Sequence, residues 1–295
     1  MIKSKTAGSR AADVVIYMVV ILMTMMCLLP LVNMVALSFS DNAAASANLV
    51  GLLPVNPTLK SYETLIGDSQ FIRSFLISVV RVVLGTIINI FLTVLMAYPL
   101  SKSKKEFKAH DIYMNIIIVA MLFSGGMIPL FLTVKNLHLI DTLWALILPG
   151  AVPIFSVILL SNFFKGVPKS LEEASQVDGA GAWTILFRVY LPISLPAIAT
   201  ITLFAIVGHW NDYMSALIYI KKSADYPLMT YIQQFSVAID LSTETDPEKI
   251  EEYMKISSRT LGAAKIIVAT LPILCIYPFM QKYFIHGIIV GSVKE

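Results

Sequence analysis

The sequence predicts an all-α, polytopic membrane protein with six transmembrane helices. Of its 295 residues, 57% are hydrophobic and 14% are charged, and the mean hydropathy is +0.77. Soluble domains carry about 25% charged residues, and a chain this apolar cannot hide its side chains in one core and keep a wettable surface. Charge-free stretches of about 20 residues, the length that crosses the hydrocarbon of a bilayer, also recur along the chain. These observations exclude an ordinary water-soluble enzyme.

Six apolar segments within a single transmembrane domain, residues 1–295, account for the predicted helices. The sixth is the shortest, but Lys265 and Lys282 flank it, and their long side chains can reach the membrane interface. Because the number of helices is even, both termini are expected on the same side. The predicted spans are residues 14–40, 73–101, 112–134, 141–164, 192–220 and 264–285.

The first apolar segment also has features of a secretory signal peptide. Basic residues precede it, and the small residues 43–47 that follow are typical of a cleavage site. However, the apolar stretch is much longer than a signal core of roughly 7–15 residues. We therefore expect a retained helix.

Lysine and arginine concentrate in the short loops on one side of the predicted helices. These residues are Lys3, Lys5, Arg10, Lys102, Lys104, Lys105, Lys108, Lys165, Lys169 and Arg188. Basic loops stay in the cytoplasm, so both termini and the loop 165–190 are predicted to be cytoplasmic. The longer segments 41–70 and 221–260 are then extracellular.

Several kinds of chemistry lack the residues that they need in this sequence. No P-loop, H-E-x-x-H or G-x-S-x-G motif occurs, so we expect no catalytic residue and no metal site in this chain. The net charge of +3 gives no reason to expect a nucleic-acid surface. Cys27 and Cys275 lie in apolar runs, which excludes a disulfide framework and favours buried thiols.

The cytoplasmic loop 165–190 is predicted to contain a short helix. Ser170 followed by Glu173 is typical of a capping box, which predicts a helix that begins at Leu171. Gly179 lies where a helix C-cap glycine belongs, and apolar residues share one stripe between these ends. Two interpretations are open, a helix lying on the lipid headgroups or a rigid peg that enters a groove of a soluble protein.

The same loop resembles the EAA loop of ABC-importer permeases. The matching residues are Glu173, Ala174, Ser175, Asp178, Gly179, Ala180, Phe187, Leu191 and Pro192. Only Ser175 departs from the commonest pattern, which has alanine there. Residues 210–213 and the ending 287–294 are similar to parts of the MalG-like carbohydrate-uptake permeases. Residues 123–129 and 277–284 resemble the LplC/YtcP-type branch of that family, which is associated with complex and often acidic oligosaccharides.

The resemblance implies a MetI-like fold and a multi-pass permease subunit in the cytoplasmic membrane. Its implied partners are a second homologous permease, two ATPase subunits, an extracellular solute-binding protein and an oligosaccharide. ATP and Mg²⁺ would be bound by the ATPase, so this chain needs no cofactor and is not itself an enzyme. The helix 171–179 would couple ATPase closure to alternating access. The coupling residues would be Glu173, Ala174, Ser175, Asp178, Gly179 and Ala180.

Polar residues inside the spans are candidates for function, since burying them in lipid is costly. We expect Asn89, Asn115 and Asn162 to hydrogen-bond between helices. For Asn211 and Asp212, lining of the substrate pathway and structural pairing are equally favoured. Trp210 and Tyr213 belong to the same candidate pathway segment, although tryptophans also anchor helices at the interface.

Glycine and proline interrupt two of the predicted spans. Gly125, Gly126 and Pro129 should loosen the third, and Pro149 with Gly150 the fourth. Broken helices are tolerated at membrane depth where they face protein or a cavity.

Two other classes of protein share parts of this pattern. An ion- or proton-coupled secondary transporter would show six spans and kinked helices, but it would need neither an ATPase nor a cytoplasmic peg. A structural membrane subunit would tolerate loss of the loop 165–190. Co-purification of an ATPase tests the first alternative, and mutagenesis of the loop tests the second.

Overall fold

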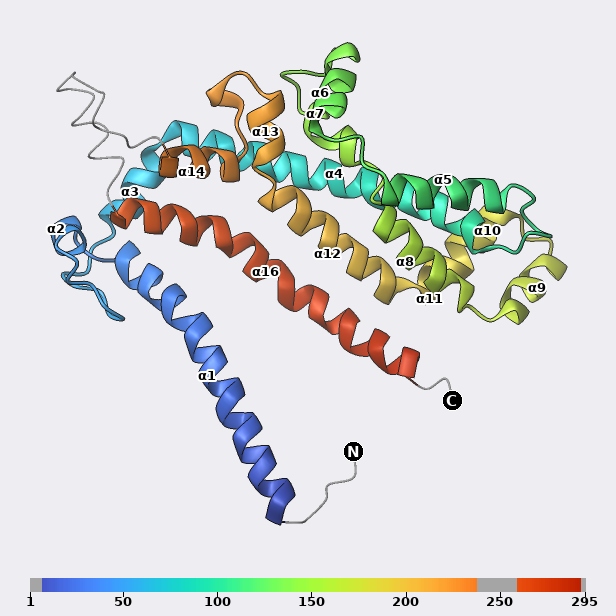
Figure 1. Ribbon diagram of the computed structural model, residues 1–295, viewed down its shortest axis with the longest axis horizontal. Helices are drawn as coiled ribbons and strands as arrows, with labels where there is room; N and C mark the ends of the chain where they lie inside the picture. The colour runs from blue at the N-terminus through green and yellow to red at the C-terminus, as the bar shows by residue number, and fades with distance from the viewer. Residues whose placement is uncertain (1–6, 238–258, 293–295) are drawn as a thin grey trace. The chain divides into compact units, whose positions relative to one another are not determined.

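The computed structural model describes residues 7–237 and 259–292, and all regular structure in these ranges is helical (Figure 1). The all-α prediction is confirmed. The described residues form two compact units. The first contains the chain up to Ser69 together with the stretch from Gln234 to Thr270, and the second contains Gln70–Gln233 and the chain from Leu271 onward.

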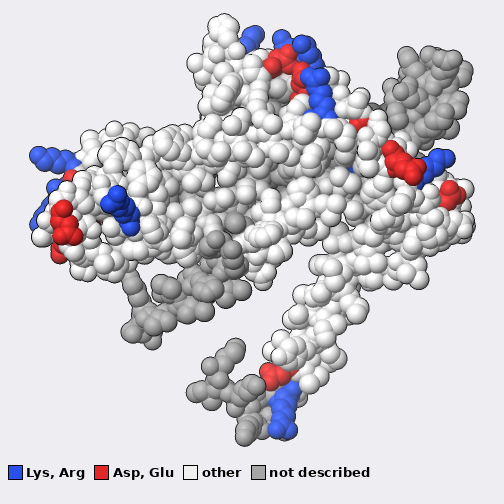
Figure 2. Space-filling model, turned by 180° about the vertical axis from the view of Figure 1, so that it is seen from behind, with Lys and Arg blue, Asp and Glu red and all other residues white. Residues whose placement is uncertain are grey.

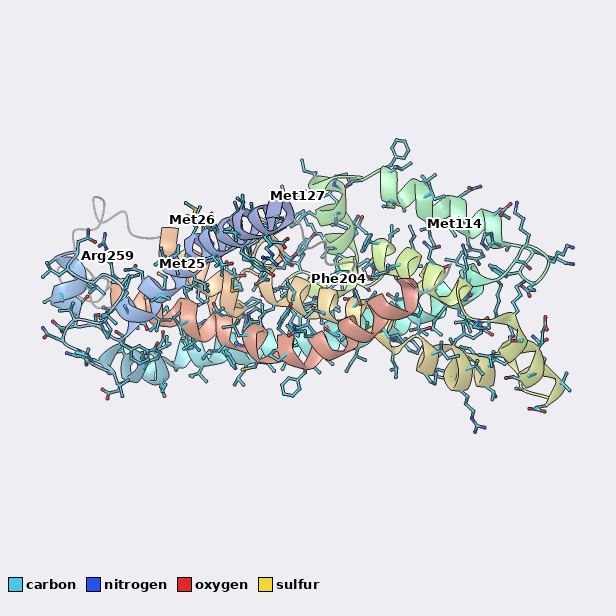
Figure 3. The ribbon with its side chains drawn as sticks, turned by 90° about the horizontal axis from the view of Figure 1, so that it is seen from below. Met25, Met26, Met114, Met127, Phe204 and Arg259 are labelled. Carbon is cyan, nitrogen blue, oxygen red and sulfur yellow. The ribbon has the colours of Figure 1, made fainter. Side chains whose placement is uncertain are left out.

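The first unit begins with a long helix whose surface is apolar on all sides. This helix, α1, spans Ala7–Ser38 and exposes nearly all its side chains from residue 10 to residue 32. Figure 3 shows Met25 and Met26 projecting from it. A helix that is hydrophobic all round suits a lipid environment. Cys27 on this helix is exposed, as is Cys275, so the prediction of buried thiols is wrong.

A segment with two short helices follows α1. It contains α2 (Asn42–Ser46) and α3 (Lys60–Gly67). The Oδ2 atom of Asp41 accepts a hydrogen bond from the Ala43 amide at 3.2 Å and so caps α2. The hydroxyl of Tyr62 donates to Ser38 Oγ at 2.8 Å, which ties α3 to the end of α1.

The last helix, α16, spans Arg259–Ser292 and so begins before the predicted residue 264. Lys265 therefore lies inside the helix, and only 3% of it is exposed. The expectation that Lys265 reaches the membrane interface is wrong. The side chain of Lys282 lies outside the described residues.

The second unit is built on α4, Ser69–Ser101, a single helix of 33 residues. The predicted third span is not one helix. It consists of α5 (His110–Leu122) and α6 (Met127–Asn136), and the helix axis bends by 117° between them. Gly126 at the break has φ +84°, a conformation that glycine adopts without steric cost. The glycines expected to loosen this span instead form a sharp turn between two helices.

The fourth and fifth predicted spans are also broken. The first break, before α8, bends the chain by 47°, and the second, before α12, bends it by 83°. The elements are α7 (Trp144–Ile147), η1 (Leu148–Gly150), α8 (Ile154–Lys165), α9 (Lys169–Val177), α10 (Ala182–Ile185), the π-helical η2 (Leu186–Tyr190), α11 (Leu191–Ile193), α12 (Leu195–Asn211), α13 (Met214–Tyr219), η3 (Ser223–Asp225) and α14 (Leu228–Val237).

Three described helices are long and apolar enough to cross a membrane, and the number becomes six if each bent pair forms one span. Figure 2 agrees with this composition, because wide uncharged surfaces separate small groups of charged side chains. In the second unit, α4, α8, η2 and α12 share one apolar core. Its buried members are Val94, Ala97, Leu160, Phe164, Val167, Ile185, Leu186, Tyr190, Ala197 and Ile201.

Candidate functional site

The predicted loop helix is present as α9, but it begins differently from the prediction. It starts at Lys169, directly after Pro168, and no side chain caps it. Ser170 therefore lies inside the first turn, and the predicted capping box with a start at Leu171 is wrong. The physical reason is Pro168, whose ring fixes φ near its observed −58° and whose carbonyl accepts the Leu171 amide at 3.2 Å.

The C-terminal end of α9 is closed by a Schellman motif. Gly179 has φ +81°, and its amide donates to the carbonyl of Gln176 at 3.0 Å. The amide of Ala180 donates to the carbonyl of Ser175 at 2.9 Å. A Cβ atom on Gly179 would meet nothing within 4 Å, so the requirement for glycine comes from the backbone and not from crowding. The predicted helix stop at Gly179 is confirmed.

Most of the predicted coupling residues lie on the free surface of this loop. Glu173, Ala174, Asp178 and Gly179 are exposed, whereas Ser175 and Ala180 are half-buried. The apolar stripe is also free, and Val177 at the end of α9 is 87% exposed. The end of α9 thus presents Val177 and the carboxylates of Glu173 and Asp178 to solvent.

Glu172 instead faces Lys102 and Tyr190, and sequence reasoning did not identify it. Its Oε1 atom lies 2.5 Å from Lys102 Nζ, and its Oε2 atom accepts a 2.7 Å hydrogen bond from the Tyr190 hydroxyl. Both charged side chains are only 12% exposed. The basic cluster at Lys102 indicated orientation, but nothing in the sequence paired it with a residue 70 positions away.

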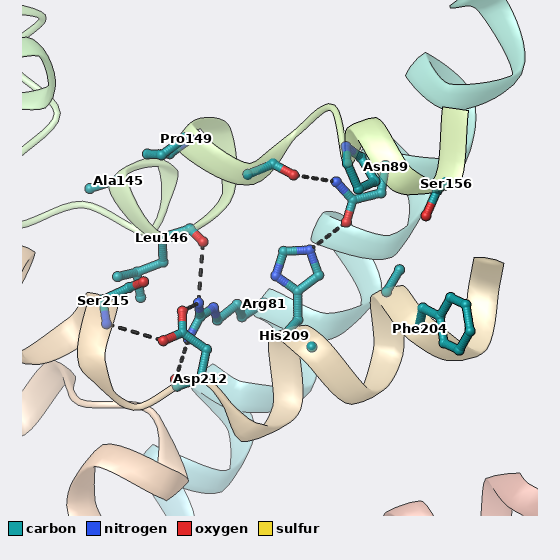
Figure 4. A pocket seen from close by; sticks show the side chains of 14 residues that line it. Arg81, Asn89, Ala145, Leu146, Pro149, Ser156, Phe204, His209, Asp212 and Ser215 are labelled. Atoms are coloured by element: carbon teal, nitrogen blue, oxygen red, sulfur yellow. Dashed lines mark hydrogen bonds and ion pairs between the residues drawn. The ribbon is translucent and has the colours of Figure 1, made fainter. Parts of the chain in front are cut away.

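A second polar arrangement lies among the spans of the second unit (Figure 4). Arg81 on α4, 1% exposed, forms an ion pair with Asp212 and donates from its Nη1 atom to the Asp212 carbonyl at 2.8 Å. Its Nη2 atom also donates to the carbonyl of Leu146 at 3.3 Å. Asp212 Oδ1 in turn accepts the Ser215 amide at 3.1 Å. Arg81 is a second residue that the sequence reasoning missed.

Asn89 joins three elements in the same region, as predicted for an interhelical hydrogen bond. Its Nδ2 atom donates to the carbonyls of Gly150 and Ala151, each at 2.9 Å, and its Oδ1 atom lies 2.8 Å from His209 Nε2. The two carbonyls fix the amide orientation, so His209 Nε2 carries the proton of the third bond. The other two asparagines, at positions 115 and 162, are exposed.

These groups line a cavity of about 280 Å³. Its walls combine Arg81, Asn89, His209 and Asp212 with apolar groups that include Phe204 (Figure 4). The cavity lies between α4, α12 and the broken α7–α8 segment.

The structure brings only one of the four candidate pathway residues to this cavity, Asp212. Trp210 is buried, and its ring packs edge-on against Phe75 with centroids 5.8 Å apart. Asn211 and Tyr213 are exposed outside the cavity wall. Within the described residues, no group of three or more His, Cys, Asp or Glu side chains could hold a metal ion.

Apolar broken helices around a polar cavity, with a capped helix on a loop between two of them, define a membrane-embedded transport subunit. Residues 89–290 match the family described as "Binding-protein-dependent transport system inner membrane component", and the chain belongs to this family. The predicted ABC-importer permease family is thereby confirmed. Members of this family are permease subunits and are not themselves catalytic.

Individual relatives agree with the predicted branch. The chain is 39% identical over 286 residues to the polygalacturonan/rhamnogalacturonan transport system permease protein YtcP of Bacillus subtilis (strain 168), covering 97% of this chain and 99% of the relative. It is 41% identical over 267 residues to Protein LplC of the same organism, covering 90% and 89%.

Solved structures confirm the predicted fold. A chain from a bacterial ABC transporter involved in import of the acidic polysaccharide alginate superposes with a TM-score of 0.86 at 29% identity, covering 95% of this chain and 99% of that chain. A second chain, from the alginate transporter in complex with an alginate pentasaccharide-bound periplasmic protein, has a TM-score of 0.57 at 15% identity, covering 94% and 96%. At that identity the second likeness bears on the fold alone.

Proposed function

We propose that this chain is one permease subunit of an ATP-driven importer for complex or acidic oligosaccharides derived from polysaccharides. It works with a second homologous permease, two ATPase subunits and an extracellular solute-binding protein. Both termini face the cytoplasm. The family membership supports the importer class, and the relatives named for polygalacturonan/rhamnogalacturonan transport and alginate import support the substrate class.

The observation that carries the coupling part of the proposal is the geometry of α9. The helix is stopped by the Schellman motif at Gly179, and it presents Glu173 and Val177 to solvent. A partner groove can receive Val177, while a basic group of the ATPase pairs with Glu173 through a charge-assisted hydrogen bond. Closure of the ATPase dimer then moves α9 and switches the cavity between inward- and outward-facing states.

The cavity between α4 and α12 supports a pathway through the second unit. Its polar groups are paired with one another, so it offers a sugar hydrogen-bonding groups without an uncompensated charge in the membrane. Asp212 and Arg81 are the pathway-lining residues of this proposal. Trp210, whose ring packs against Phe75, is not part of the cavity lining.

The direct test uses the purified four-subunit complex in proteoliposomes with its binding protein. Oligogalacturonates and their methyl-esterified forms of the same chain length make matched pairs, because esterification removes the carboxylate charge and adds only a methyl group. We expect the acidic member of each pair to stimulate ATP hydrolysis and to accumulate inside. Equal import of both forms would contradict the acidic substrate class. Import without ATP would contradict the importer and favour a secondary transporter.

A further inference from the structure

The two adjacent glutamates of α9 have opposite environments. Glu173 is exposed, whereas Glu172 is 12% exposed and bonded to two groups of the second unit. Successive residues on an α-helix point about 100° apart. Adjacent residues in one turn can therefore contact a partner protein and the rest of the permease at the same time.

Lys102, the partner of Glu172, is held from three directions. Its Nζ atom lies 4.5 Å from the ring centroid of Tyr98 and 4.4 Å from that of Tyr190. The same atom donates to the Tyr190 hydroxyl at 3.0 Å. We name the four residues Tyr98, Lys102, Glu172 and Tyr190 the anchor cluster. A charged group desolvated over aromatic faces and paired with a carboxylate has little freedom to move.

The anchor cluster joins α9 to the ends of the transmembrane elements. Tyr98 lies in the last turn of α4, Lys102 directly follows α4, and Tyr190 ends the π-helical segment that leads into α12. Phe164, near the end of α8, packs edge-on against both tyrosine rings, with centroids 6.5 and 5.4 Å apart. Phe164 and Tyr190 are buried, at 1% and 4% exposure.

A π-helical segment at this place is itself unusual. Such segments are rare, and they occur mostly as single turns at functional positions. The Tyr190 hydroxyl, at the end of this segment, lies 2.7 Å from Glu172 Oε2. Glu172 therefore contacts Lys102 after α4 and Tyr190 in η2, and Phe164 of α8 packs on the tyrosine rings beside it.

We infer that Glu172 is a positioning residue for energy coupling: through Lys102 and Tyr190 it transmits the displacement of α9 to α4 and α12. This inference rests on the proposed function and assigns different roles to the two glutamates. Glu173 binds the ATPase, and Glu172 binds the permease body. Loss of Glu172 then leaves the ATPase bound to the permease, but closure of the ATPase no longer drives transport through the pathway.

The test compares Glu172→Gln with Glu173→Gln in the complete complex in proteoliposomes, so that the same chemical change is made one residue apart. Three quantities are measured: ATPase retained on purification, ATP hydrolysed, and oligogalacturonate imported. For Glu172→Gln we expect retained ATPase, hydrolysis within about twofold of the parent, and import reduced about tenfold, the size of effect that couples contacting charged residues. Glu173→Gln should instead release the ATPase.

Two further variants separate coupling from stability. Tyr190→Phe removes only the hydroxyl and keeps the ring packing. Like Glu172→Gln, it should raise the ratio of ATP hydrolysed to sugar imported, in a complex that still folds and purifies at the parent level. Lys102→Arg keeps a cation over the tyrosine rings and opposite Glu172, and it should keep import within about threefold of the parent.

Three other results would contradict either the inference or the proposed coupling through α9. A normal ratio of ATP to sugar in both Glu172→Gln and Tyr190→Phe would overturn the inference and leave the proposed function standing. Release of the ATPase by Glu172→Gln would make Glu172 a docking residue, which also overturns it. If Glu173→Gln and Gly179→Leu transport normally as well, the proposed coupling through α9 itself fails.

Discussion

The guanidinium of Arg81 on α4 and the carboxylate of Asp212 after α12 form an ion pair between residues 131 positions apart in the chain. Arg81 is 1% exposed and the Asp212 side chain is 30% exposed. Asp212 occupies the break between α12 and α13, so the pair holds the broken end of one helix to the continuous helix beside it. A buried cation in this position needs its partner far more than a surface cation does.

Loss of Asp212 should therefore destabilise the protein strongly. Asp212→Asn leaves the Arg81 charge buried without compensation, which costs on the order of 3–5 kcal/mol. We expect a lower thermal unfolding midpoint of the purified complex and reduced membrane levels. Arg73→Met is the matched control, because its pair with Asp225 has side chains 58% and 37% exposed and is worth about 0–1 kcal/mol. Equal effects of the two changes would show that the buried pair contributes nothing special.

At Gly85, α4 packs directly against the His209 ring of α12. A Cβ atom built on Gly85 would lie 2.4 Å from His209 Nε2, and the ring cannot turn away without breaking its bond to Asn89. Gly85→Ala should cost about 1–3 kcal/mol of stability through overpacking. Gly208→Ala, where nothing lies within 4 Å of the added atom, should be neutral or stabilising. Thermal unfolding of both variants measures the difference, and a harmless Gly85→Ala would contradict the close contact.

The end of α9 should be sensitive to its backbone conformation. Gly179→Leu puts a branched side chain at φ +81°, which costs about 1–2 kcal/mol locally. Because the position is exposed, we expect normal membrane levels and reduced uptake. Gly181→Leu is the matched control, since Gly181 has φ −75° and an added Cβ there would also meet nothing. Uptake assays in cells that express equal amounts of each variant distinguish the two, and equal uptake would make the Schellman motif dispensable.

Glu173 on the exposed face of α9 should be needed for ATPase binding. Glu173→Ala removes a charge-assisted hydrogen bond worth about 1.5–3 kcal/mol, which should release the ATPase on purification and abolish substrate-stimulated hydrolysis. Lys169→Ala, in the first turn of the same helix, should have a milder effect. Normal transport by Glu173→Ala would leave the loop as a mere connector.

The proposed orientation is testable by labelling single cysteines in a chain with Cys27 and Cys275 replaced by serine. Lys104→Cys, at a side chain 73% exposed, should react with membrane-impermeant reagents only after the cells are opened. Leu53→Cys, at a residue 78% exposed in the predicted extracellular segment, should react in intact cells, or in spheroplasts if an outer membrane is present. The reverse pattern would overturn the topology.

The sequence by itself determined the class of this protein, because the signals involved are local. Charge-free stretches indicate membrane helices wherever they occur, and Gly126 and Gly179 mark backbone turns that need no distant partner. The EAA resemblance likewise rests on one continuous loop, and the family match confirms it.

Only the tertiary structure decided which polar residues meet. Glu172 and Glu173 are chemically identical neighbours, and their roles differ because α9 turns one toward Lys102 and the other toward solvent. Arg81 and Asp212 pair across two helices, and Trp210, adjacent to the cavity-lining segment, turns into the core instead. These outcomes depend on how the helices pack side by side, and a pattern along one chain does not contain the rotation of each helix about its own axis.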